Sequence, residues 1–122
     1  MRLPRGERIK GRTTMLRMIR EGASVEGSLL VIRYQINADC VARRAGFTVS
    51  RRFRRAVDRN LVRRRLREVY RTHREQLPDR GDFLIIARAG AEHATYAEIV
   101  ESFTSLAGRI ADPDPEPADT AL

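Results

Sequence analysis

The chain has 122 residues, of which 24 are basic and 16 acidic, so its net charge is +8 with histidine neutral. This length suits one domain with a small core, and this charge excludes a strongly cationic main partner. It favours a polyanion, either nucleic acid or an anionic membrane surface. No apolar run approaches the roughly 18 residues of a membrane-spanning helix, and the N-terminus lacks the pattern of a secretory signal. One cysteine and two histidines exclude a disulfide framework and a zinc-finger pattern. These features predict a cytoplasmic protein.

The N-terminal part is predicted to be a basic arm followed by a short helix. Residues 1–12 are basic, contain Pro4 and two glycines, and show no periodicity. Thr13 or Thr14 could cap a helix that runs to about Glu21, with Gly22 ending it.

Two strands are predicted next. In residues 28–36, every second residue is apolar, and the residues between them turn polar toward the end of the segment. This pattern predicts a strand with one buried face. Residues 37–39 form a predicted turn, and residues 44–50 form a second strand. If the connection is a hairpin, this strand is antiparallel to the first.

From about Val57 to Arg74 the apolar period becomes helical. The core-facing stripe of this helix comprises Val62, Leu66, Val69, Tyr70 and His73. The opposite face comprises Asn60, Arg64, Arg67, Arg71 and Arg74. Leu77 and Pro78 end the helix.

The remaining chain predicts one strand, one helix and a tail. Residues 83–87 are a continuous apolar run, typical of a strand covered on both faces. Thr95 and Glu98 have capping-box spacing and open a last helix that reaches Ile110. Acids alternating with prolines in residues 111–122 predict a disordered tail. The predicted fold is an α+β two-layer sandwich, with residues 13–110 as a single domain and helices packed on one small sheet.

The strongest local feature is the charge of residues 51–74. This segment holds eleven arginines and two acids, a local balance of +9 that exceeds the charge of the whole chain. Usually a charge run is a solvated helix face with ion pairs four residues apart, but here the acids needed for such pairs are missing. Like charges at that spacing, such as Arg63 with Arg67, destabilise a helix by about 0.2–0.5 kcal/mol each. An anionic partner explains the segment better.

RNA fits this helix better than DNA does. The arginine face runs for about four turns, and the sequence has neither helix-turn-helix spacing nor dimerising heptads. A rigid basic helix on a sheet suits recognition of RNA backbone and shape.

Several motifs together closely resemble the protein subunit of bacterial ribonuclease P, from about Glu7 to Ile110. The first is Arg44-Ala-Gly-Phe-Thr-Val-Ser-Arg-Arg52. The second begins at Ala56-Val57 and continues with Arg59-Asn60, Arg63-Arg64 and Arg67-Glu68. The third is Gly81-Asp82-Phe-Leu-Ile-Ile-Ala-Arg88, followed by Thr95-Tyr96. The second motif is specific because it lies between the other two.

The resemblance implies a fold and a function. The fold is a small, mostly antiparallel four-stranded sheet with three helices, in which the arginine helix is a left-handed crossover between parallel strands. The function is removal of the 5′ leader from precursor tRNA by a ribonucleoprotein endonuclease. Its catalyst is an RNA subunit that holds Mg²⁺. The protein binds that RNA and the leader, and it requires no protein partner, membrane or organic cofactor.

The resemblance also implies site residues. The RNA-binding residues would be Arg51, Arg52, Arg59, Asn60, Arg63, Arg64 and Arg67, with Arg71 added from the arginine face. The positions that line the leader cleft align with Met15, Ile19, Arg33 and Thr48. The sequence departs from the family where aromatic residues are common at the positions of Met15 and Ile19, and where a basic residue usually stands at the position of Leu61.

No protein catalytic residue and no metal ligand is predicted. One cysteine and two histidines supply no nucleophile–base pair, which agrees with catalysis by the RNA. Two alternatives stay open: a ribosome-associated or chaperone-like RNA-binding protein with no part in an enzyme, and a DNA-binding regulator.

Overall fold

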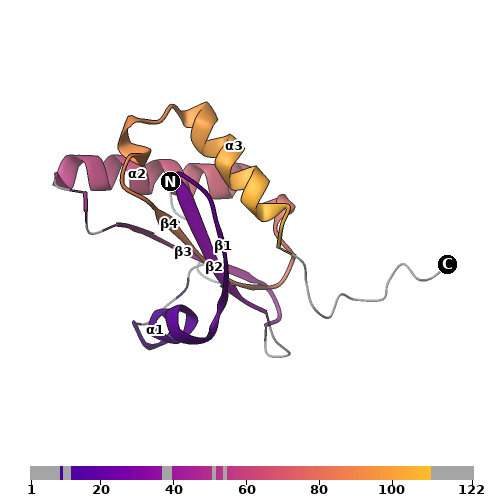
Figure 1. Ribbon diagram of the computed structural model, residues 1–122. Helices are drawn as coiled ribbons and strands as arrows, with labels where there is room; N and C mark the ends of the chain where they lie inside the picture. The colour runs from indigo at the N-terminus through magenta and orange to yellow at the C-terminus, as the bar shows by residue number, and fades with distance from the viewer. Residues whose placement is uncertain (1–8, 10–11, 37–39, 51, 54, 111–122) are drawn as a thin grey trace.

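The computed structural model describes residue 9 and residues 12–36, 40–50, 52–53 and 55–110 (Figure 1). The helices are α1 (Arg12–Glu21), α2 (Ala56–His73) and α3 (Tyr96–Ala107). The strands are β1 (Ala23–Glu26), β2 (Leu30–Gln35), β3 (Arg43–Val49) and β4 (Gly81–Ala87), and they form one sheet in the order β1-β2-β4-β3. The predicted α+β class is confirmed.

The helices lie on both faces of the sheet, so they do not share the single layer that the sequence suggested. In Figure 1, α2 and α3 lie on one side of the strands and α1 on the other. Side chains of β4 alternate accordingly. Phe83 and Ile85 belong to the large core under α2 and α3, whereas Leu84 belongs to a small cluster with Met18 of α1 and Ile9. Because both faces of β4 are covered by apolar clusters, its sequence is a continuous apolar run.

The two strands predicted at residues 28–36 and 44–50 correspond to β2 and β3, and the connection between them is not a hairpin. β2 pairs antiparallel with β4, and β3 pairs parallel with β4 along its other edge. The connection from β3 through α2 to β4 is therefore a crossover between adjacent parallel strands, as the family resemblance implies. The left-handedness of that crossover stays a prediction. The order of the strands depends on hydrogen bonds between segments far apart in the sequence. The alternation of apolar residues within one strand does not show which strand lies beside it.

The N-terminal region differs from expectation in two details. Helix α1 begins at Arg12, so Thr13 and Thr14 lie inside it rather than capping it. Strand β1, which pairs antiparallel with β2, was not predicted because its four residues are too short to show a period. Within the segment expected to be a basic arm, Ile9 is buried and donates its N–H to the Ala45 carbonyl of β3 at 3.0 Å. Residues 1–8 and 10–11 of that arm and the tail at 111–122 lie outside the described residues.

Helix α3 begins as its sequence predicts. The Thr95 hydroxyl accepts the Glu98 N–H at 3.1 Å, and the Glu98 carboxylate accepts the Thr95 N–H at 2.8 Å, which completes the capping box. Gly81, the first residue of β4, has φ +131°, a conformation that favours glycine. None of the described helices has the length and apolar character needed to cross a bilayer.

Candidate nucleic-acid interface

Helix α2 turns one face to the core and the opposite face to solvent. Four residues of the predicted stripe are fully buried: Val62, Leu66, Val69 and Tyr70. His73, the fifth, is only half-buried at the last turn. Because the core-facing residues fix the rotation of the helix, Asn60, Arg64 and Arg67 are exposed on the far side. The helix is thus a rigid support for outward-facing arginines.

One arginine of the predicted face is neutralised within the helix. Arg71 meets Glu68 through two hydrogen bonds, from Nε to Oε1 at 3.2 Å and from Nη2 to Oε2 at 2.6 Å. These hydrogen bonds hold the pKa of the Glu68 carboxyl below its ordinary value and raise the pKa of Arg71. The sequence indicated that pairing acids were missing, and Glu68 supplies one.

Two further arginines of α2 donate hydrogen bonds to backbone carbonyls outside the helix, and these contacts show which side of α2 faces which neighbour. Arg65 donates to the Ala94 carbonyl at 3.1 Å, just before α3. Arg59 donates to the Phe53 carbonyl at 2.9 Å, in the connection from β3. By helical periodicity Arg63 and Arg67 lie on the flank away from Arg65. Since α3 packs over β2 and α2 over β3 and β4, this flank overhangs the β3 edge of the sheet.

Three arginines of α2 have no partner in the part of the chain that the structure describes. They are Arg63, Arg64 and Arg67, which make no hydrogen bond or ion pair with a described residue. They lie within two turns of one helix, and their mutual repulsion is not relieved by nearby carboxylates. This arrangement favours a polyanion with closely spaced charges.

The opposite face of the sheet carries the residues assigned to the leader cleft. Arg33 of β2 and Thr48 of β3 lie on either side of β4, on the face that α1 partly covers. Arg33 donates from Nη1 to the Ile19 carbonyl at 3.0 Å, which ties the end of α1 to the sheet. Ile19 is 45% exposed. Met15 belongs to α1, but its side chain lies outside the described residues. The structure therefore brings Ile19 and Arg33 into contact and places Thr48 on the same face.

A charged pair on that face was missed by the sequence analysis. Arg44 of β3 and Asp82 of β4 are register partners, and the guanidinium donates to both carboxylate oxygens at 2.8 and 2.9 Å. Asp82 is only 7% exposed, and its hydrogen bonds raise the pKa of Arg44. Both residues belong to the quoted motifs, and the only signal was an acid at the start of an apolar strand. The ion pair gives Arg44 and Asp82 a structural role, which is to join β3 to β4.

The connection between β3 and α2 joins the two faces. Arg52 is exposed there, and its backbone N–H donates to the Ser50 hydroxyl at 3.2 Å. Arg51 lies outside the described residues. At the β3 edge of the sheet, Arg52 thus lies between Thr48 on one face and the flank of α2 that overhangs the other.

Comparisons with known proteins agree with this geometry. A family model described as Ribonuclease P matches residues 3–111. The ribonuclease P protein component of Clostridium novyi is 32% identical over 108 residues, which are 88% of this chain and 96% of that protein. The component from Dictyoglomus turgidum is 37% identical over 87 residues, 71% of this chain and 72% of the relative. The solved ribonuclease P protein of Thermotoga maritima matches with a TM-score of 0.75 at 27% identity, covering 86% of this chain and 98% of that one. The chain belongs to the ribonuclease P protein family.

As a ribonuclease P protein component, the chain is an RNA-binding subunit of a ribonucleoprotein that processes tRNA. No finding favours the ribosome-associated or DNA-binding alternatives. The motifs that carried the resemblance now have places in the fold. The arginine motif forms the outward face of α2, and the other two form the parallel strands that α2 connects.

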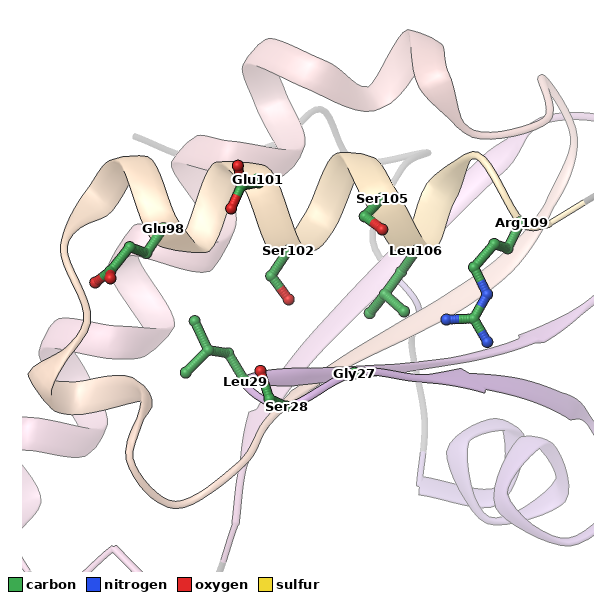
Figure 2. Close-up of a pocket in the computed structure, with 9 residues that line it drawn as sticks. All are labelled: Gly27, Ser28, Leu29, Glu98, Glu101, Ser102, Ser105, Leu106 and Arg109. Carbon is green, nitrogen blue, oxygen red and sulfur yellow. The ribbon is translucent and has the colours of Figure 1, made fainter.

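This ribonuclease P protein also has a pocket of about 430 Å³ between α3 and the β1–β2 turn, away from the outward face of α2 (Figure 2). Three serines, Ser28, Ser102 and Ser105, line it together with two glutamates and Arg109. No histidine or lysine is among its lining residues, so the serines have no base of the usual kind beside them. Arg109 donates to the Glu26 carbonyl at 3.3 Å. The pocket supplies no nucleophilic constellation.

Proposed function

We propose that this protein binds the catalytic RNA of ribonuclease P through α2 and holds the 5′ leader of precursor tRNA on the opposite face of the sheet. The observation that carries the proposal is the set of three arginines on α2, Arg63, Arg64 and Arg67, that have no partner among the described residues of a member of this family. Arginine forks suit phosphate oxygens, and neutralised phosphates release counterions. Docking is therefore electrostatic and depends on salt.

The RNA-binding surface also includes residues beside the three arginines. Asn60 is exposed on the same face of α2, and Arg52 lies at the β3 edge that this face overhangs. Arg59 and Arg71 lie within this surface but already have protein partners, so they contribute by exchanging those partners for phosphate. Arg51 completes the set by its position beside Arg52.

The leader is single-stranded and binds between α1 and the sheet. Ile19 and Thr48 offer a partly apolar surface for bases, and Arg33 supplies positive charge at the end of α1. With Ile19 at a position where the family often has an aromatic residue, bases contact an aliphatic group there instead of stacking on a ring. This protein therefore gains less affinity from the leader bases at this position than a stacking ring would give.

Catalysis belongs to the RNA and its Mg²⁺ ions. The described residues include no group of three or more His, Cys, Asp or Glu side chains arranged to ligate a metal. Mg²⁺ needs oxygen ligands in octahedral geometry, which RNA phosphates and water supply. Mg²⁺ held by the RNA would supply Lewis-acid chemistry at the scissile phosphate. The chain's own contribution is to dock the RNA and position the substrate.

Reconstitution tests this division of labour. Precursor tRNA is incubated at low Mg²⁺ with the cognate RNA subunit alone, with this protein alone, and with both together. We expect cleavage at the 5′ end of the mature tRNA only when both are present, because the protein raises substrate affinity. Efficient 5′ cleavage by RNA-free protein, or no stimulation of the RNA, would contradict the proposal.

A further inference from the structure

A second basic surface, without partners in the described part of the chain, lies on α1, on the opposite face of the sheet from α2. The first twenty residues of the chain hold seven basic residues and one acid. Within α1, Met18 is fully buried against Leu84, and Arg17 and Arg20 are exposed. Neither arginine makes a hydrogen bond or ion pair with any residue that the structure describes. The helix dipole favours Arg20 in the last turn, but Arg17 lies in the turn before it.

The exposed surface of α1 changes from apolar to basic around the helix. Helical periodicity orders its side chains as Ile19, Leu16, Arg20 and Arg17, from one flank of the helix to the other across the side opposite the buried Met18. Ile19 and Leu16 are each 45% exposed and neighbour each other on the helix surface, so they form a small apolar patch. A chain that contacts Ile19 and passes over Leu16 next reaches two guanidinium groups.

This order fits a single strand of nucleic acid better than a folded one. Helix α1 is only about 10 Å across, and a flexible strand can bend around it while a rigid duplex cannot. Bases would contact Ile19 and Leu16, and the following phosphates would meet Arg20 and Arg17. Helix α2 lies on the other side of the strands (Figure 1), so a folded RNA docked on it would not occupy the surface of α1.

We propose that Arg17 and Arg20 bind the backbone of the precursor leader upstream of the cleft, where the strand leaves the sheet and crosses α1. The proposal rests on the proposed function, since it extends the leader path assigned there to Ile19. It identifies the partner as single-stranded RNA phosphate. A longer leader therefore binds more tightly than a short one, and the gain comes from these two arginines.

The test measures substrate binding to the holoenzyme as leader length increases. Wild-type and R17A/R20A proteins are each assembled with the RNA subunit, and their affinity for precursor tRNA is measured with a short leader, with longer leaders, and with mature tRNA. The variant should lose the affinity gained from longer leaders, and its log–log salt slope for long leaders should fall by about 1.4, two single-strand phosphates' worth. The R17K/R20K variant keeps the charge and should retain most of the gain.

The other outcomes are distinguishable. An unchanged gain with longer leaders in R17A/R20A would overturn this inference alone. So would an equal loss for all leaders and for mature tRNA, because it would assign the arginines to the RNA subunit or the tRNA body. Absence of cleavage by the wild-type holoenzyme would overturn the proposed function and this inference with it. Unchanged melting temperatures in both variants establish that the fold is intact.

Discussion

Arg44 and Asp82 face each other across the parallel strands β3 and β4, and the guanidinium of Arg44 donates to both carboxylate oxygens of Asp82. A bidentate pair of this kind has a fixed orientation, so it specifies the register of two strands that α2 separates by more than thirty residues. Asp82 is nearly buried, and both of its carboxylate oxygens accept hydrogen bonds from Arg44. The pair thus supports the sheet on which both proposed RNA surfaces are built.

Removing the charge of Asp82 should destabilise the protein. In D82N, one oxygen acceptor becomes an NH₂ donor that faces the guanidinium, so the free energy of unfolding should fall by about 1–3 kcal/mol. Urea denaturation measures this, and E75Q, at an exposed acid, is the matched control. A double-mutant cycle with R44A should show coupling. Equal stability of D82N and E75Q would contradict a structural role for the pair.

Gly81 should tolerate no side chain. Its φ is +131°, and an added Cβ would lie 2.8 Å from Cγ1 of Ile36 and 3.0 Å from Cζ of Phe83. G81A should therefore lower the free energy of unfolding by about 1–3 kcal/mol. The control is G108A, because Gly108 has φ −66° and its nearest neighbour is at 3.5 Å. That variant should be neutral or slightly stabilising, and equal effects in both variants would show that the backbone at Gly81 is unstrained.

The local sequence pattern predicted α2 and α3, but it did not predict which strands pair in the sheet. The stripe from Val62 to Tyr70 and the box of Thr95 with Glu98 depend on residues three or four apart, which a sequence displays directly. The partner of β3 depends on a strand more than thirty residues away, and alternation within β3 fits either neighbour.

The site was predicted in outline for the same reason. Periodicity placed Arg64 and Arg67 on the outward face of α2, where they lie. It did not show that Arg71 pairs with Glu68, although the two are three residues apart, because the surplus of arginines left the choice of partner open. The cleft residues Ile19 and Arg33 came from the family resemblance alone, since no local period relates a helix to a strand beyond it.

Glu68 should restrain RNA binding by occupying Arg71. E68Q replaces the charge-assisted pair with at most one neutral hydrogen bond, so Arg71 can turn to phosphate at lower cost. Affinity for the RNA subunit should rise and the log–log salt slope should steepen by up to about 0.7–0.9, one phosphate's worth. Because the pKa of Glu68 is lowered, its pair is present above the ordinary glutamate pKa and is lost as pH falls through the folded value. Acidification should therefore raise the RNA affinity and steepen the salt slope of the wild-type protein, and it should not add to them in E68Q.

The control for that comparison is E101Q, which adds the same charge on an exposed part of α3. Binding titrations at several salt concentrations distinguish the two variants. If E101Q steepens the slope as much as E68Q does, net charge and not Arg71 is responsible.

The most direct test of the docking face is the salt dependence of RNA-subunit binding by R64A/R67A. Both side chains are exposed and unpartnered among the described residues, so the free energy of unfolding should change by no more than about 0.5 kcal/mol. The log–log slope should flatten by about 1.4–1.8 relative to wild type, because two phosphate contacts are lost. The R88A/R109A variant removes the same charge near the β1–β2 turn and should keep the wild-type slope. A slope in R64A/R67A equal to that of wild type would contradict the assignment of α2 as the RNA-docking surface.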